Sequence, residues 1–206
     1  MDTERAKADL RQDLQQGRDA VLWKLAGLSE YDVRRPMTPT GTNLLGLVKH
    51  LAFVELGYFG VVFGRPVPEA VRWIENDGDP NWDMWALASE PRQDLVDGYR
   101  RAWAHADVTI ERLPLGAPGS VPWWRAERRG VTLHQVLVHV IAETHRHAGH
   151  ADVVRELIDG AAGLRAANGN LPDRDDAWWR SYCARLDAEA LSVTSAAPSQ
   201  GPATSL

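Results

Sequence analysis

The chain has 206 residues, a formal charge of −5 and a single cysteine, Cys183. This length fits one domain with a core of its own. The acidic balance, with no basic stripe, argues against a nucleic-acid partner, and we expect no membrane partner because no apolar run approaches ~20 residues. One cysteine excludes an internal disulfide framework. Together with a charged N-terminus unlike a secretory signal, it predicts a cytoplasmic protein.

Apolar residues at helical spacing predict an all-α fold built from four long helices. In chain order these are Thr3–Leu28, Thr42–Phe63, a helix that begins near Ser89, and Thr132–Gly160. We expect antiparallel neighbours in one four-helix-bundle domain over residues 1–191, which includes an extra C-terminal helix at Asp175–Leu191. Residues 192–206 are small, polar and proline-containing, and are predicted to be a disordered tail.

The second predicted helix is apolar nearly all round, so it is either central in the bundle or also covered by a partner subunit. We therefore predict a homodimer. The alternative cover is the long connection Pro66–Ser89, expected to be a functional loop or a partly helical lid. An extended segment is expected at Val121–Trp124.

Nine tryptophans are unusual for this length, and five of them fall in predicted loops. Loop tryptophans either cap the ends of a bundle or wall a pocket, and the sequence does not decide between these uses. The pair Trp123 and Trp124 provides candidates for a substrate pocket. The five are Trp73, Trp82, Trp85, Trp123 and Trp124.

Five of the seven histidines lie in the fourth predicted helix, so periodicity must choose among them. At about 100° per residue, Glu143 and His147 fall within the apolar sector, whereas His145 falls on the solvated side. His139 and His150 lie at the boundary, beside Glu143. These two are candidates for substrate-facing or catalytic groups.

A buried carboxylate needs a partner, because leaving it unpaired costs several kcal/mol or more. A hydrogen bond between Glu143 and His147 is one solution, and a divalent metal held by both is the other. His50 lies on the apolar face of the second predicted helix. Such a histidine is typically a satisfied core residue, but here it offers a third ligand. Two imidazoles and one carboxylate form an open site for zinc, with nickel and iron as alternatives.

The segments LVKHLAFVE and HVIAETHRHAGHADVVRELIDG resemble the DinB-like superfamily, in its actinobacterial branch. That superfamily includes mycothiol-dependent maleylpyruvate isomerase, whose metal-binding domain this chain resembles over most of Thr3–Gly160. The resemblance implies a DinB-like four-helix bundle whose metal ligands are His50, Glu143 and His147. Many members have histidine at the position of Glu143. The isomerase also has a separate C-terminal domain that contributes to its substrate site, so the substrate here need not be maleylpyruvate.

The resemblance implies a metal-dependent thiol S-transferase or thiol-dependent isomerase. In it, the metal-bound thiolate of a small thiol, mycothiol or another, attacks an electrophilic small molecule. An open divalent ion favours the thiolate at neutral pH. One alternative is a metallohydrolase that activates water, with His139 or His150 as base. The other is a non-catalytic, metal-stabilised stress or binding protein.

Overall fold

The computed structural model describes residues 3–75, 78–166 and 168–195. The chain forms two compact units, Met1–Asn170 and Leu171–Leu206, and the boundary falls within the range predicted as a single domain. The first unit holds four long helices, so the predicted all-α class is confirmed. They are α1 (Thr3–Trp23), α3 (Leu44–Glu55), α5 (Arg92–Arg112) and α6 (Leu133–Asp159).

Shorter elements connect these helices. They are α2 (Glu30–Arg34), a π-helical turn (Leu56–Gly60), 3-10 turns at Val61–Phe63, Trp82–Met84 and Ala126–Arg128, α4 (Pro68–Ile74), and strands β1 (Pro118–Ser120) and β2 (Gly130–Thr132). The strands pair antiparallel, with Gly119 opposite Val131. They flank the predicted extended segment at Val121–Trp124 rather than coincide with it. The connection at Pro66–Ser89 is partly helical, as predicted, and Trp73 lies in α4 instead of a loop.

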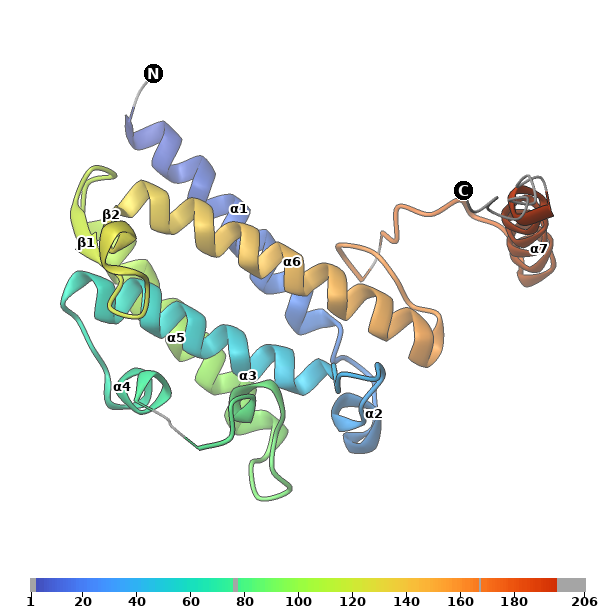
Figure 1. Cartoon of the computed structure of the whole chain (residues 1–206), viewed down its shortest axis with the longest axis horizontal. Coiled ribbons are helices and arrows are strands. Elements are labelled where there is room, and N and C mark those ends of the chain that lie inside the picture. The colour runs from blue at the N-terminus through green and yellow to red at the C-terminus, as the bar shows by residue number, and fades with distance from the viewer. Residues whose placement is uncertain (1–2, 76–77, 167, 196–206) are drawn as a thin grey trace, which may run out of the picture. The chain divides into compact units, whose positions relative to one another are not determined.

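α1 lies alongside α6, and α3 lies alongside α5 (Figure 1). The first pair runs in one direction, since Gly17 packs against Thr144 and, further along both segments, Lys24 pairs with Asp152. A Cβ at Gly17 would lie 2.9 Å from the Thr144 side chain, so glycine permits this close approach.

α3 and α5 also run in one direction. Leu44 and Tyr99, near the starts of both helices, belong to one buried cluster, while Val54 and Ile110, near their ends, belong to another. The expected antiparallel order is therefore wrong within both pairs. The connection over residues 64–91 explains the difference, because it is long enough to return the chain along the bundle before α5 begins.

Local chemistry accounts for the helix boundaries. The predicted capping box at Thr132 and Gln135 is present, and Gly160 ends α6 in the left-handed conformation. α1 stops at Trp23 instead of Leu28, and in the turn that follows, the Arg155 guanidinium binds the carbonyl oxygens of Lys24 and Ala26 at 2.8 Å. α5 starts at Arg92, not near Ser89, with Pro91 as its N-cap.

α3 continues through its π and 3-10 turns as a 20-residue stretch, Leu44–Phe63, long and apolar enough to cross a membrane. This corrects the expectation that no apolar run reaches that length. However, 78% of its most apolar window is buried inside the chain, as in the core helix of a globular protein. Because other parts of the same chain cover this helix, its apolar surface no longer calls for a partner subunit. The homodimer stays a prediction.

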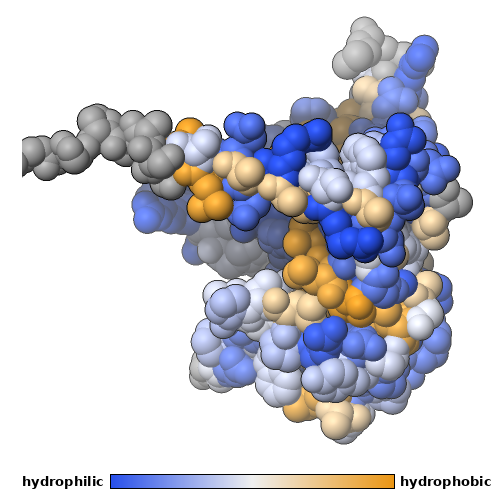
Figure 2. Space-filling view, turned by 90° about the vertical axis from the view of Figure 1, so that its right-hand side faces the viewer, coloured by the Kyte–Doolittle hydropathy of each residue, from blue (hydrophilic) through white to orange (hydrophobic). Residues whose placement is uncertain are grey.

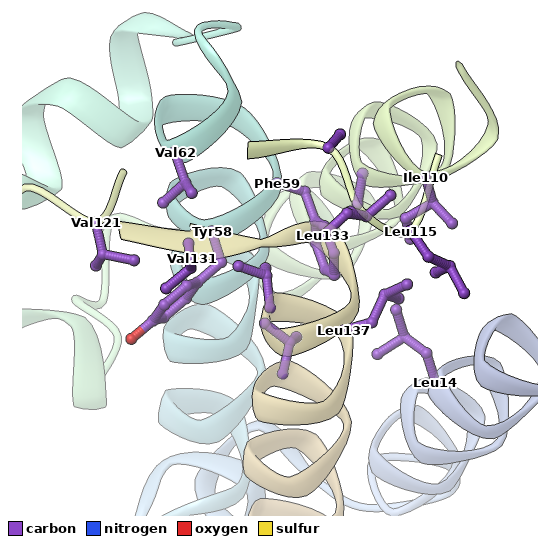
Figure 3. Close-up of a cluster of buried hydrophobic side chains, with 14 of the residues drawn as sticks. Leu14, Tyr58, Phe59, Val62, Ile110, Leu115, Val121, Val131, Leu133 and Leu137 are labelled. Atoms are coloured by element: carbon purple, nitrogen blue, oxygen red, sulfur yellow. The ribbon is translucent and has the colours of Figure 1, made fainter. Parts of the chain in front are cut away.

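The described residues of the bundle form two buried apolar clusters, one toward each end. Figure 3 shows the cluster beside the strands, where Tyr58, Leu133 and Leu137 lie among side chains from all four long helices. The ring of Tyr58 packs in this cluster, while its hydroxyl projects outward (Figure 3). Hydrophobic residues also reach the surface, and Figure 2 shows one face on which they lie among hydrophilic ones.

The second unit contains α7 (Asp176–Ser195), which confirms the predicted C-terminal helix and extends it. Trp178 stacks on Tyr182, with ring centroids 5.2 Å apart and planes 8° from parallel. The predicted disordered tail is wrong for residues 192–195, which are helical. Residues 196–206 lie outside the described residues.

Candidate metal centre

Three side chains that could hold a metal ion meet between the two apolar clusters. One ligand atom each from His50, Glu143 and His147 lies within 4.8 Å of the others. The closest pair is His147 Nε2 and Glu143 Oε1, at 3.0 Å, and His50 Nε2 lies 3.8 Å from the same oxygen. Side chains predicted from the sequence as a set are therefore adjacent in space.

Two helices, α6 and α3, position these three side chains. Glu143 and His147 are one turn apart on α6, so their side chains project from the same face. His50 comes from α3, which runs opposite to α6. His139, early in α6, contacts Tyr58, which follows the end of α3. His147, later in α6, contacts His50, which lies earlier in α3. The two helices therefore run in opposite directions. Antiparallel packing brings the middle of α3 to the middle of α6.

The spacing and chemistry of these donors fit a divalent ion. Zinc bonds of about 2.0–2.2 Å at tetrahedral angles would separate neighbouring ligand atoms by about 3.3–3.6 Å. The observed separations of 3.0 and 3.8 Å from Glu143 lie on either side of this range. Three protein ligands would leave a coordination position open, as in catalytic sites.

Asp83 is part of the site and was missed in the sequence. Its Oδ2 lies 2.7 Å from His50 Nδ1, and only 7% of the residue is exposed. A carboxylate at Nδ1 fixes the proton there, so Nε2 faces Glu143 with its lone pair free. Ligand histidines are commonly oriented in this way.

The loop that carries Asp83 is fastened to α3. The Asn43 side chain caps α3 through the Gly46 amide and also donates to the Met84 carbonyl at 3.1 Å. A Cβ at Gly46 would lie 1.8 Å from that carbonyl oxygen, so only glycine permits the contact. Lys49 donates to the Trp85 carbonyl at 3.2 Å. One face of α3 therefore sets the position of the residue that orients His50.

A pocket of about 540 Å³ opens onto the triad. Trp82 and Trp123 contribute aromatic wall, while Asp79, Asn81 and Arg146 contribute polar groups. Two of the five loop tryptophans thus line a pocket beside the triad.

Residues 9–160 match the sequence family described as mycothiol-S-transferase. The chain belongs to the mycothiol-S-transferase family. None of the curated proteins compared with the chain matches it. The family match spans α1 to α6 and contains all three triad residues together with Asp83, so it covers the whole of the candidate centre. It leaves out α7.

Burial determines the protonation state of His147, the most buried side chain of the triad. Burial, followed by the neighbouring His50, lowers the pKa of His147 to about 4, so the ring is neutral at pH 7. Burial raises the pKa of the Glu143 carboxyl, but its interactions with His147, His50 and Arg146 outweigh this and leave the pKa below its ordinary value. A neutral imidazole and an ionised carboxylate are the states that bind a cation.

The other α6 histidines have separate surroundings. His145 faces away from the triad, as predicted, since its Nε2 lies 3.0 Å from the Asp13 carbonyl on α1. His150 is exposed, and its Nδ1 lies 3.3 Å from His147 Nδ1. It therefore contacts the outer edge of a triad ring. His139 contacts Tyr58 and Trp124 instead, with ring centroids at 4.7 and 5.4 Å.

Proposed function

We propose that this chain is a metal-dependent mycothiol S-transferase, which joins the sulfur of mycothiol to an electrophilic small molecule. The observation that carries the proposal is the convergence of His50, Glu143 and His147 at the pocket. Family membership supports the thiol and the class of reaction. Zinc is the metal that best suits two imidazoles and a carboxylate, with nickel and iron as alternatives.

The triad residues would hold the ion through His50 Nε2, His147 Nε2 and the Glu143 carboxylate. When bound, a divalent ion supplies Lewis acidity that keeps a coordinating thiol deprotonated at neutral pH. Asp83 accepts the N–H of His50 Nδ1 and keeps the imidazole pointed at the site. Burial keeps His147 neutral and therefore able to donate a lone pair.

The pocket would position the thiol. Mycothiol carries a hydroxyl-rich sugar–inositol head, which suits a wall of mixed aromatic and polar character. Trp82 and Trp123 offer apolar faces, and Asp79 and Asn81 offer hydrogen-bonding groups. In the transfer step a carbon–sulfur bond forms, the leaving group departs with its electron pair, and the thiol proton passes to solvent.

Turnover with defined reactants tests this function. Zinc-loaded protein is incubated with mycothiol and 1-chloro-2,4-dinitrobenzene, and the thioether is quantified by liquid chromatography and mass spectrometry. We expect formation that depends on the protein, metal and thiol, and is lost in His147→Ala but kept in His145→Ala. The second variant is the matched control, because it removes an α6 histidine that faces Asp13.

Other outcomes select the alternatives. Equal turnover after removal of the thiol, measured on a panel of esters and amides, would indicate a metallohydrolase. Stoichiometric metal without turnover of any thiol and electrophile would indicate a metal-stabilised binding protein. A rearranged substrate without a retained thiol would indicate an isomerase. Each of these results would overturn the transferase proposal.

A further inference from the structure

We infer that the electrophile binds in a second pocket beside the triad and is an anion with a flat, unsaturated or aromatic body. This rests on the proposed function, which leaves the chemical class of the electrophile open. The pocket has a volume of about 430 Å³. Its lining residues are Trp123, Trp124, Arg125, Arg128 and His139.

The second pocket is adjacent to the first. Trp123 lines both, so the two pockets meet at this residue. His139 lies one helical turn before Glu143 on α6, a rise of about 6 Å along the axis. A molecule held in the second pocket would therefore lie within reach of a thiol held at the triad.

The aromatic walls of this pocket are fixed by one hydroxyl. Tyr58 is anchored in the apolar cluster, and its projecting oxygen accepts hydrogen bonds from the indole nitrogens of Trp123 at 3.4 Å and Trp124 at 3.2 Å. Tyr58 sits in the π-helical turn, an irregularity that is common at functional sites. With their N–H groups engaged, the two indoles offer their ring surfaces, which suit a flat apolar body.

The charge of this pocket is positive. Arg125 and Arg128 lie at the two ends of one short turn, both exposed, and no carboxylate is found among the described residues that line the pocket. Arg129 differs, because its Nε donates to the Trp124 carbonyl at 2.9 Å and holds the loop. Guanidinium groups bind carboxylates and similar oxyanions with two parallel hydrogen bonds.

The two pockets divide the substrates by charge. Among the described residues that line it, the triad pocket has the carboxyl groups of Asp79, Asp83 and Glu143 and one guanidinium, that of Arg146. With a divalent ion at the triad, these three carboxylates and Arg146 would balance its charge, so the lining suits an uncharged, hydroxyl-rich thiol and offers an oxyanion no excess positive charge. The arginine pair is therefore assigned to the electrophile.

Binding of an unreactive probe tests the assignment without turnover. Isothermal titration calorimetry on the zinc-loaded full chain compares 3,5-dinitrobenzoate with its uncharged match, 3,5-dinitrobenzamide. We expect roughly tenfold tighter binding of the carboxylate, the gain from one charge-assisted contact. The double variant Arg125→Gln/Arg128→Gln should remove this preference. Arg112→Gln, an exposed arginine at the end of α5, is the charge control and should keep it.

Two results would overturn the inference. One is equal affinity of the wild type for both probes. The other is a preference that survives the double arginine variant but disappears in His147→Ala, because the carboxylate would then bind at the metal. Trp124→Leu should weaken both probes by a similar factor, since it removes ring surface without changing charge.

A kinetic comparison separates this inference from the proposed transfer. With mycothiol, 4-chloro-3,5-dinitrobenzoate and the corresponding benzamide both lose chloride as the carbon–sulfur bond forms. We expect the arginine variant to lower kcat/KM about tenfold for the benzoate alone. Carboxylate-selective binding without turnover would reject the transferase and retain the pocket, whereas turnover without carboxylate preference would do the reverse.

Discussion

The Arg18–Glu55 pair and the His50–Glu143–His147 triad both lie between long helices of the bundle, and they differ in how their charges are balanced. Arg18 of α1 binds Glu55 of α3 through both carboxylate oxygens, at 2.9 and 2.5 Å, and neither residue is more than 1% exposed. Asp107 of α5 completes the pairing at 2.9 Å. At the triad, two imidazoles and a carboxylate converge beside an open pocket.

The difference separates a structural interaction from a site. The Arg18–Glu55 pair has its own counter-charge and bidentate geometry, so it is complete within the chain. Burial still raises the pKa of Glu55 to about 7, which shows that these surroundings penalise its charge even beside Arg18. At the triad His147 is neutral at pH 7, and the cation beside Glu143 is the exposed Arg146 guanidinium, whose Nη1 lies 3.9 Å from Glu143 Oε2. A carboxylate and lone pairs that meet at a pocket are what a metal ion would complete.

The largest expected effect comes from breaking the closed pair. Glu55→Gln removes the fully buried carboxylate from Arg18 and leaves the half-buried Asp107 as its counter-charge, so we expect the free energy of unfolding to fall by about 3–5 kcal/mol. Urea denaturation measures the change, and metal content should stay at the wild-type level. A loss of metal with unchanged stability would reverse the roles assigned to the two groups.

A double variant controls this prediction. Arg18→Met/Glu55→Leu removes both charges and fills the space with apolar atoms, and such replacements are often neutral or stabilising. We expect the double variant to be more stable than Glu55→Gln alone. Equal destabilisation would indicate that packing, and not the unpaired charge, causes the loss.

The second prediction removes one triad ligand. His147→Ala should lower the affinity for zinc by more than about 100-fold, because loss of an outer orienting group alone typically costs 10–100-fold. Metal content after dialysis, measured by mass spectrometry, checks this. His145→Ala should retain wild-type content, and equal retention in both variants would contradict the triad.

The third prediction concerns orientation rather than ligation. Asp83→Asn keeps the shape of the side chain but weakens its hold on His50 Nδ1, so zinc affinity should fall by about 10- to 100-fold. A competition titration with a chromophoric chelator measures the affinity. Asp94→Asn, at an exposed position on α5, removes the same charge as a control. An unchanged affinity in Asp83→Asn would show that the hydrogen bond to His50 does not matter for binding.

The smallest effect is a dependence on pH in the metal-free protein. His147 has a pKa of about 4 when folded and an ordinary value near 6.5 when unfolded. As pH falls between these values the unfolded chain gains a proton that the folded chain does not, so stability decreases. From pH 6.5 to 5 we expect a loss of about 1–2 kcal/mol. His147→Gln should flatten this slope, and an equal slope in both proteins would contradict the assigned protonation.

Regular periodicity explains what could be predicted from the sequence. Four helices, the capping box at Thr132 and the inward direction of Glu143 and His147 all follow from residue spacing within one segment. The outward direction of His145 follows from the same spacing. The direction of each helix relative to its neighbours does not, because it depends on the path of the connection over residues 64–91.

Two residues that were not predicted, Asp83 and Arg18, differ in whether residue spacing along a helix carries a signal for them. Asp83 lies in an irregular turn, and no period links it to His50, which it contacts only because the loop folds back on α3. The burial of Arg18 is predictable from the sequence, because it follows Leu14 by four residues and precedes Val21 by three, on the apolar face of α1. A charged residue on such a face predicts a buried partner, and that partner is Glu55.

The loop fastened at Gly46 has a thermodynamic consequence. It carries both Asp83, which hydrogen-bonds His50, and Trp82, which lines the pocket. Any molecule that steadies this loop by binding in the pocket would raise the affinity of the triad for its ion. Thermodynamic linkage then requires the bound ion to raise the protein's affinity for that molecule by the same factor. Thiol and metal would therefore bind cooperatively even without direct contact between them.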